Sequence, residues 1–452
     1  MVFTEIMCSE AIKQNRFSAE FFDPKYTFAP NSNYVWQKIG RFLKVCQYGV
    51  SISMNEKGKG FPILRMNELE NCFAIEPTKY ANISEKEYQQ FKVNVNDILF
   101  NRTNSIDFVG RTGIVKDEFE SVFASYLIKI VPDRNYVNPE YLTIYLNTTF
   151  GIGQIKRRAM PSINQANVSA AEMKHILVPI LPFNEQEQIS NLVNEAHRKK
   201  QLSQSLYTRA QELLERELGL DKLVFEKPLS YEARLSEVVG NNRADAEFYQ
   251  PMYLKLRTLV RNYKHGFSKL TDIAFSLPPN VDPGKFANTE FEYVELSSIN
   301  PTLGIIGKGT KLLGKEAPSR ARRKLETGDI LASAVVGSVD KAAIVDSSSN
   351  DKLASTGFFQ FRPKQIKSEY LLILVRSKLI TMQLQQEATG GILSAVPDNR
   401  LHNVIIPTLP DDLQCEISDL VYKSHKLFHK SQQLLEQAKR RVEELIEQGV
   451  QK

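Results

Sequence analysis

The chain has 452 residues, of which 42% are hydrophobic and 24% charged, and its formal net charge is +6. This composition is typical of soluble globular proteins and excludes a chain that is disordered throughout. No apolar run approaches the roughly 18 residues of a membrane helix, and the N-terminus MVFTEIMCSE lacks the basic charge of a signal peptide, so we expect a cytoplasmic protein without a membrane partner. The length predicts two to four domains, and the mildly basic charge permits nucleic acid as a partner without requiring it.

A long internal repeat divides the sequence. Residues 9–26 (SEAIKQNRFSAEFFDPKY) match residues 236–253 (SEVVGNNRADAEFYQPMY), which aligns Arg16 with Arg243 at an offset of 227 (243 − 16). Residues 178–189 (VPILPFNEQEQI) match residues 406–417 (IPTLPDDLQCEI) at nearly the same offset, 228 (406 − 178). Solenoid repeats are much shorter, about 20–50 residues, so this repeat predicts two similar domains and two related sites.

Each half predicts the same order of elements. In the first half, runs rich in β-branched and aromatic residues occupy 61–66, 95–102, 112–116 and 125–131, and a helical pattern follows at 138–151. In the second half, similar runs occupy 291–296, 328–336, 342–346 and 357–363, and a helical pattern follows at 368–385. Each globular part is therefore predicted to be α+β.

Each half closes with a long helix. The first is predicted from the capping pair Asn184 and Glu187 to Gly219, and the second from Asp411 to about Gly449. The second helix carries a heptad seam, which is typical of a coiled coil, at Ile417, Val421, Ser424, Phe428, Ser431, Leu435, Ala438, Val442 and Leu445. Small residues in both seams favour two helices in close contact; the alternative is that each helix packs on its own globular half. The predicted division is 1–183 (globular), 184–222 (helix), 223–409 (globular) and 410–452 (helix).

Motifs of catalysis are absent from the sequence. There is no P-loop, and the NPEY at 138–141 has Glu140 in place of the second proline of a methyltransferase NPPY. The FGIGQ at 150–154 is predicted to be a turn, and His425 and His429 to be exposed helix residues rather than zinc ligands. The four cysteines show no metal-site spacing and are expected to be reduced and mostly buried thiols. The pattern indicates a non-catalytic reader or adaptor with no cofactor and no metal.

The whole chain resembles the specificity subunits of type I restriction–modification systems. The resemblance is carried by two α+β halves and by the words 48–69 (YGVSIS…GKGFPILRMNEL), 157–189 (RRAMPSINQANVSAAEMKHILVPILPFNEQEQI) and 388–417 (ATGGILSAVPDNRLHNVIIPTLPDDLQCEI). One departure is Leu413, Gln414 and Cys415, which stand where the first copy has Glu185, Gln186 and Glu187.

The resemblance implies two target recognition domains, each reading one half of a bipartite double-stranded DNA site. It implies that the two helices pair as an antiparallel coiled coil, which spaces the domains and docks two adenine-methylating modification subunits, and that restriction subunits complete the nuclease. The chain itself would be non-catalytic.

Candidate DNA-binding residues are polar or basic side chains near predicted strand ends, where Lys and Arg suit phosphates and polar groups suit base edges. In the first half they are Arg65, Asn67, Arg102, Asn104, Arg111, Lys156, Arg157, Arg158, Ser162 and Asn164. In the second half they are Ser297, Ser298, Lys341, Thr389, Gly390, Ser394 and the basic run Arg320, Arg322, Arg323 and Lys324. Any one of these could instead be a turn residue or a solvated charge.

Two other functions remain open on the sequence. The chain could be a coiled-coil scaffold whose globular halves bind protein, or a methyltransferase with unfamiliar motifs. Cofactor binding by the isolated chain would favour the methyltransferase.

Overall fold

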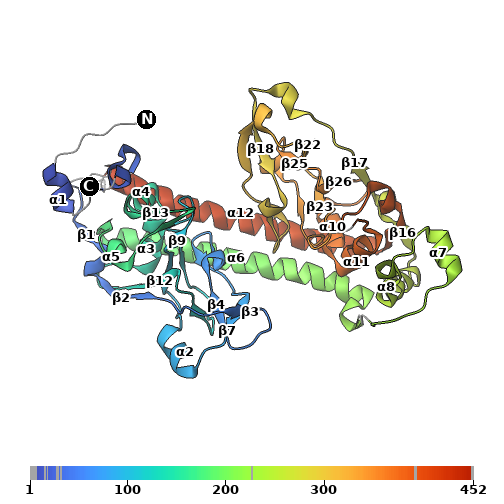
Figure 1. Ribbon diagram of the computed structural model, residues 1–452, viewed down its shortest axis with the longest axis horizontal. Helices are drawn as coiled ribbons and strands as arrows, with labels where there is room; N and C mark the ends of the chain where they lie inside the picture. Colours follow the sequence, from blue (N-terminus) through green and yellow to red (C-terminus); the bar gives the residue numbers. More distant parts are fainter. Residues whose placement is uncertain are drawn as a thin grey trace. The chain divides into compact units, whose positions relative to one another are not determined.

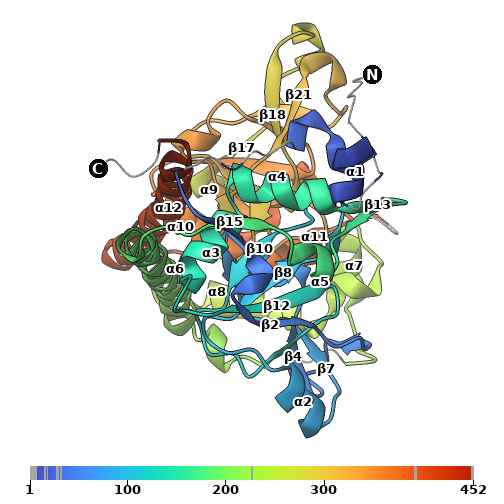
Figure 2. The ribbon, with the colours of Figure 1, turned by 90° about the vertical axis from the view of Figure 1, so that its left-hand side faces the viewer.

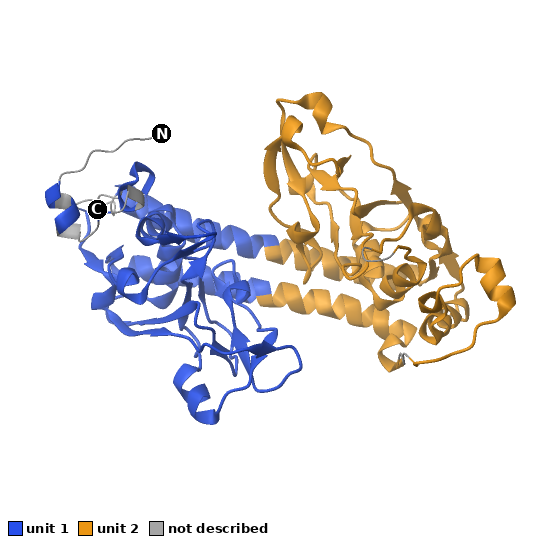
Figure 3. Ribbon diagram, in the orientation of Figure 1, with its two compact units in different colours: residues 1–200, 429–452 blue, residues 201–428 orange. Residues whose placement is uncertain are grey.

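The structure is a computed structural model that describes residues 8–14, 17, 19–26, 30, 33–224, 228–390 and 394–448. The chain divides into two compact units, residues 1–200 with 429–452 and residues 201–428, which Figure 3 colours separately. Both units contain sheets and helices, which confirms the predicted α+β class with a long helix after each globular part.

The first unit is built on a six-stranded sheet (Figure 1). The strands lie in the order β2 (Leu43–Tyr48), β12 (Leu127–Pro132), β8 (Ile98–Asn101), β10 (Thr112–Ile114), β6 (Phe73–Ala74) and β5 (Leu69–Glu70). A four-stranded sheet follows the order β11 (Val122–Phe123), β4 (Phe61–Leu64), β7 (Lys79–Ala81) and β3 (Met54–Asn55). A three-stranded sheet joins β13 (Met160–Ser162), β14 (Gln165–Asn167) and β9 (Thr103–Asn104), and β1 (Trp36–Lys38) pairs with β15 (Leu177–Pro179).

The second unit repeats the six-stranded sheet in the same strand order, whereas its four-stranded sheet carries the outer strand at the opposite edge. Its six-stranded sheet runs β17 (Ala274–Leu277), β26 (Phe358–Pro363), β23 (Ile330–Ser333), β24 (Ala342–Ile344), β20 (Ile305–Ile306) and β19 (Ile299–Asn300). Its four-stranded sheet runs β21 (Thr310–Leu313), β18 (Glu290–Val294), β25 (Leu353–Ser355) and β22 (Ala321–Lys324), and β16 (Phe267–Lys269) pairs with β27 (Ile405–Pro407).

Helices complete each unit. In the first unit they are α1 (Cys8–Gln14), α2 (Glu85–Phe91), α3 (Pro139–Leu146), α4 (Thr149–Arg158) and α5 (Ala170–Met173), with 3₁₀ turns η1 (Ala19–Phe22), η2 (Pro24–Tyr26) and η4 (Met66–Glu68). In the second they are α7 (Leu235–Asn241), α8 (Pro251–Arg261), α9 (Leu270–Ile273), α10 (Ser368–Arg376) and α11 (Lys378–Glu387), with η6 (Ala246–Tyr249) and η8 (Leu296–Ser298). The long helices α6 (Phe183–Leu218) and α12 (Asp411–Gln448) contribute to both units.

The core of the first unit lies between its large sheet and the helices. Figure 2 shows α3 between α6 and strands β8, β10 and β12. Buried side chains from β8 and β12, such as Ile98 and Ile130, share one apolar cluster with Tyr141 of α3, Val193 of α6 and Val442 of α12. The long helices therefore close this core rather than standing apart from it.

Within each unit, α6 and α12 are antiparallel. In the first unit the Ser431 hydroxyl donates to the Ala196 carbonyl at 2.7 Å, and Arg441 Nη2 donates to Glu185 Oε2 at 2.9 Å. In the second unit the Ser424 hydroxyl donates to the Ser203 carbonyl at 2.7 Å, so the partner number in α12 falls as the number in α6 rises. All nine seam residues of α12 are buried. The helices thus pack on each other and on the globular parts, and both interpretations of the seam hold.

A glutamine clamp appears in both halves at the same place. The Gln154 side-chain amide of α4 donates to the Leu177 carbonyl at 2.8 Å, and its oxygen accepts from the Leu177 backbone N–H at 2.9 Å. The Gln383 side chain of α11 makes the same two contacts with Ile405, at 2.8 and 2.9 Å. The clamp fixes α4 and α11 to the strand that leads into each long helix.

Several predicted details are wrong. The helical patterns at 138–151 and 368–385 each form two helices, because the side chains of Thr148 and Ser377 cap a new helix by accepting from a backbone N–H. The FGIGQ segment is not a turn but part of α4; a Cβ on Gly151 would lie 2.2 Å from the Tyr145 carbonyl oxygen, so glycine is required where α4 meets α3. Helix α6 begins at Phe183, which places the predicted cap Asn184 inside the helix.

Two predictions about burial also fail. Only one cysteine, Cys72, is buried, while Cys46 is half-buried and Cys8 and Cys415 are exposed. His425 is buried in α12, where its Nε2 lies 2.8 Å from the Leu303 carbonyl oxygen and its ring stacks on Tyr207. Within the described part of the chain, no cluster of His, Cys, Asp and Glu side chains could hold a metal ion.

Candidate nucleic-acid interface

A β-hairpin carries two of the DNA-binding residues predicted in the first unit. Strands β13 and β14 pair Met160 with Asn167 and Ser162 with Gln165, and a two-residue turn of Ile163 and Asn164 joins them. Asn164 adopts the left-handed region (φ 59°), which asparagine tolerates better than most residues. The predicted residues Ser162 and Asn164 are both exposed here. The sequence therefore places hydrogen-bonding side chains on a projecting two-stranded ribbon.

Arg102 holds this hairpin to the body of the unit. Its Nη2 donates to Asn167 Oδ1 at 3.0 Å, its guanidinium lies 4.8 Å from the centre of the Tyr48 ring, and its carbonyl accepts from the Val168 N–H. The Asn167 amide in turn donates to Thr103 Oγ1 at 3.2 Å. The half-buried Arg102, predicted as a DNA contact, thus acts in the structure as a brace beneath the ribbon.

The basic run at the end of α4 separates into two kinds of side chain. The Nε of Arg157 donates to the Phe21 carbonyl at 2.8 Å, and its guanidinium lies 4.3 Å from the centre of the Phe21 ring. Arg158 forms an ion pair with Glu172 at 3.2 Å. Lys156 instead lines a pocket beside the hairpin. The sequence grouped the three cations, but the structure uses two of them to fasten α4 to other segments.

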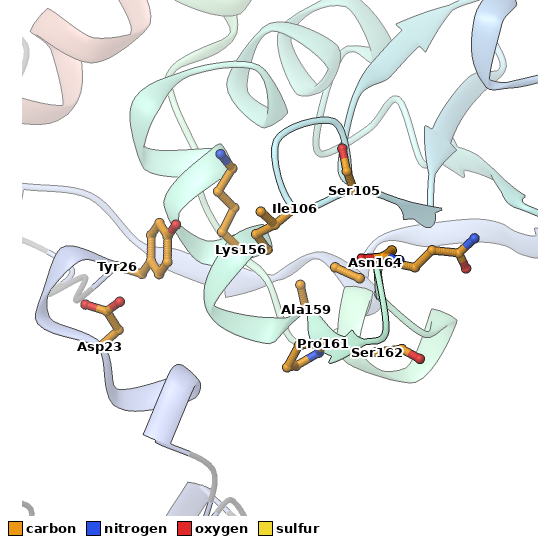
Figure 4. A pocket seen from close by; sticks show the side chains of 11 residues that line it. Asp23, Tyr26, Ser105, Ile106, Lys156, Ala159, Pro161, Ser162 and Asn164 are labelled. Atoms are coloured by element: carbon orange, nitrogen blue, oxygen red, sulfur yellow. The ribbon is translucent and has the colours of Figure 1, made fainter. Parts of the chain in front are cut away.

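The pocket has a volume of about 530 Å³ and lies where four segments meet. Figure 4 shows its lining side chains: Asp23 and Tyr26 from the repeated N-terminal word, Lys156 from α4, Ser105 and Ile106 from the β9–β10 loop, and Ser162 and Asn164 from the hairpin. Three of the predicted residues therefore share one cavity. Tyr26, Ser105 and Gln165 line it as well and were not predicted as site residues; the only sequence signal for Tyr26 is its place in the repeat.

The second unit has a pocket in the corresponding place, with a volume of about 650 Å³. Thr389, Gly390 and Ser394, all predicted, line it together with Arg243, Asp245 and Phe248 of the repeated word. Ala395 bridges both Thr389 and Val335, the same cross-strand arrangement that joins β14 to β13 and β9. The Arg243 guanidinium bonds to both Asp245 oxygens, at 2.7 and 3.0 Å, and holds the pKa of that carboxyl below its usual range.

Residues 33–207, which include the first hairpin and all of the pocket lining except Asp23 and Tyr26, match the family described as type I restriction modification DNA specificity domain. These residues are therefore similar to the type I DNA specificity family. The predicted resemblance is thereby confirmed.

Two curated relatives carry corresponding names. The putative type I restriction enzyme MjaX specificity subunit of Methanocaldococcus jannaschii is 27% identical over 158 residues, which are 34% of this chain and 37% of that protein. The type I restriction enzyme EcoKI specificity subunit of Escherichia coli is 25% identical over 178 residues, which are 38% of this chain and 37% of that protein. The matched regions thus span little more than a third of either relative. Both names are those of specificity subunits.

Solved structures extend the likeness over 94% of this chain. The type I restriction–modification S subunit from M. genitalium gives a TM-score of 0.43 at 12% identity, with 97% of that chain covered. The HsdS subunit from Thermoanaerobacter tengcongensis gives a TM-score of 0.31 at 12% identity, with 99% covered.

The remaining candidates of the first unit are partly engaged elsewhere. Arg65 forms a 2.5 Å ion pair with the buried carboxylate of Glu68 and a 3.0 Å hydrogen bond to Thr78. Asn104, in β9, donates to the Met66 sulfur at 3.3 Å. Asn67 and Arg111 are exposed, with the Arg111 guanidinium 4.6 Å from the centre of the Phe108 ring. Of these four, Asn67 and Arg111 best retain groups that a ligand could reach.

The basic run of the second unit lies on and beside β22. Arg323 is only 3% exposed, its Nη1 donates to the Leu277 carbonyl at 2.5 Å, and burial lowers the pKa of its guanidinium. Arg322 pairs with Asp282 at 2.5 Å and Lys324 with Asp351 at 2.9 Å, whereas Arg320 is exposed. Arg323 is buried and Lys324 is exposed because successive side chains of a strand point to opposite faces.

The last three candidates lie on loops and short turns of the second unit. Ser297 is exposed on η8, and the Ser298 hydroxyl accepts from the Glu295 N–H at 3.2 Å, so it caps this turn. Lys341 is half-buried just before β24.

Among the helices that the structure describes, none is long and apolar enough to cross a membrane.

Proposed function

We propose that this chain is the DNA-recognition subunit of a type I restriction–modification complex. Each unit reads one half of a bipartite double-stranded DNA site, and the long helices dock two adenine methyltransferase subunits, which restriction subunits then join. The chain itself is non-catalytic and needs no cofactor. The division into recognition domains 1–183 and 223–409 and helices 184–222 and 410–452 belongs to this proposal.

One observation carries the proposal. The chain builds the same constellation twice, a repeated N-terminal word, the end of a clamped helix and a cross-strand connection around a pocket, and the helix and hairpin of the first copy lie inside the match to a DNA specificity domain. A two-stranded β-ribbon is an element that the major groove of duplex DNA can admit. Two such surfaces in one chain fit a site with two separate parts.

The surface that we propose for DNA is smaller than the set predicted from the sequence. In the first unit it comprises Asn67, Arg111, Lys156, Ser162 and Asn164, and in the second unit Ser297, Arg320, Lys341, Thr389, Gly390 and Ser394. It leaves out Arg65, Arg157, Arg158 and Arg323, because their guanidinium groups are committed to intramolecular partners. Arg102 and Asn104 support the hairpin from below.

The decisive experiment is to produce the chain with its modification subunit and to map the methylated positions in the host genome. We expect methylated adenines in one bipartite sequence, and neither methylation nor S-adenosylmethionine binding by the isolated chain. A complex that assembles but binds no DNA would favour the protein-binding scaffold. Methylation by the isolated chain would favour the methyltransferase.

A charge variant tests the proposed surface itself. Replacing both Arg111 and Lys156 with alanine should weaken DNA binding by the assembled complex and make it less dependent on salt. The slope of log K against log salt should fall by about 0.9 for each phosphate that the variant no longer neutralises. The matched control is Lys86→Ala, which removes an exposed cation from α2. An unchanged salt slope in the double variant would show that the phosphates lie elsewhere.

A further inference from the structure

Ile163 is an apolar side chain at the tip of the first hairpin. It is 91% exposed, among the highest values of any large hydrophobic residue in the described part of the chain. Its neighbours in the turn region, Ser162, Asn164 and Gln165, are exposed and polar. Single exposed apolar residues are common on proteins, so exposure alone assigns no role to Ile163. A role is indicated by its position at the tip and by the contacts that hold the hairpin in place.

The tip is held on a fixed base. Three cross-strand pairs define β13 and β14, and Ala166 and Asn167 pair in turn with β9. Pro161, within β13, restricts the backbone of the ribbon, and Arg102 secures Asn167 from beneath. The hairpin therefore holds Ile163 at a defined place. Because this side chain is exposed, it adds no buried apolar surface that would stabilise the folded chain.

Charge and hydrogen-bonding groups around the tip favour duplex DNA as the occupant. Lys156 lies in the pocket at the base of the hairpin, and the exposed Arg111 follows the loop that forms another wall of this pocket. The apolar Ile163 side chain has polar neighbours on both sides and cations nearby. This arrangement is complementary to stacked bases with phosphates at the edges of the groove. Architectural proteins that bind the minor groove insert isoleucine, leucine or phenylalanine between base steps, and an apolar side chain at a hairpin tip has the same chemistry.

We propose that Ile163 is a wedge that inserts into the base stack of the first half-site and unstacks one base step. The inference rests on the proposed function and adds a specificity device, because the energy of unstacking depends on the step that is deformed. At the offset of the two clamp glutamines, 229 (383 − 154), Ile392 corresponds to Ile163 in the second half; it lies outside the described residues.

The test uses the complex of the full chain with its modification subunit and a duplex carrying the mapped site. 2-Aminopurine, which fluoresces when it is unstacked, is placed in turn at each position of the first half-site except the methylated adenine. The variants are Ile163→Ala, which removes the wedge, and Ile163→Leu, which keeps an apolar side chain of similar size. The control is Val95→Ala, which shortens a side chain that is 38% exposed. Val95 lies before the start of strand β8, whereas Arg102 directly follows the end of this strand.

We expect one position to brighten with the unaltered chain, with Ile163→Leu and with Val95→Ala, and to stay dark with Ile163→Ala. Binding of Ile163→Ala to the mapped site should weaken about tenfold, the effect of burying one aliphatic side chain, with non-specific binding unchanged. An identical fluorescence profile for Ile163→Ala would overturn the wedge alone. So would loss of assembly with the modification subunit, which would make the tip a protein contact. A complex that binds no DNA selectively would overturn the proposed function instead.

Discussion

If α6 and α12 set the distance between two half-sites, lengthening both helices should lengthen the spacer in the DNA. The structure fixes where the insertions belong. Because Ser431 contacts Ala196 and Ser424 contacts Ser203, paired positions in the two helices have numbers that add to 627. Seven residues inserted after Lys200 and seven after Phe428 fall at the border between the two units, so each unit keeps all of its own residues.

The expected change follows from helix geometry. Seven residues are two turns of a coiled coil and about 10 Å of helix at 1.5 Å per residue, so the seam continues in phase through residues such as Val421 and Leu435. If the DNA axis follows the helices, 10 Å corresponds to roughly three base pairs at 3.4 Å each. Three base pairs also turn the second half-site by about 100°, since B-DNA has about 10.5 base pairs per turn. We therefore expect weaker binding together with a spacer that is longer by three.

Methylation mapping of a host that carries the lengthened subunit measures the outcome. Both half-site sequences should remain the same while the spacer grows. The control inserts seven residues in α6 alone; it shifts Tyr207 and Leu214 against α12 and should cost the second unit much of its stability, because both side chains belong to its core. An active complex with the original spacer would refute the reasoning, and changed half-sites would place recognition in the helices.

Two further predictions concern stability, measured by urea unfolding of the full chain. Arg362→Met should destabilise the second unit by roughly 2–4 kcal/mol. It leaves Asp329, which is 1% exposed, without the guanidinium that contacts both of its carboxylate oxygens. A change in the free energy of unfolding below about 0.5 kcal/mol would contradict the need for this partner. Gln154→Ala and Gln383→Ala should each cost roughly 1–3 kcal/mol, because each leaves buried backbone groups without their partners; two very different values would show that the repeated clamp is not equivalent in the two units.

Much of the fold could be predicted because its signals are local. The strand that begins at Ile98 is a compact apolar run between polar turns, and the seam of α12 repeats every seven residues; both patterns depend only on neighbours in the sequence. The break between α3 and α4 was missed, although Thr148 is a residue type that caps helices. The apolar pattern continues through it, and only tertiary packing decides that the chain turns there.

The candidate site was predictable in part only. Ser162 and Asn164 were predicted as candidate contacts, but the hairpin that carries them was not predicted. The uses of Arg157 and Arg323 could not be predicted, because their partners are backbone carbonyls 136 and 46 residues away in the sequence. A cation in a sequence does not reveal whether its charge is already satisfied by a distant segment.

The repeat also separates what the two halves keep from what they change. Both keep the glutamine clamp, but three and four residues after Gln154 the first half has Arg157 and Arg158, whereas the second half has Gln386 and Glu387 at the same places. Each half satisfies its own choice: Arg158 pairs with Glu172, whereas Glu387 pairs with Arg257 at 2.9 Å. The polarity of the ion pair is reversed while the helix stays in the same clamp, so the framework constrains neither the charge nor the shape of the surface beside it. Two such surfaces on one framework are what a reader of an asymmetric, two-part DNA sequence requires.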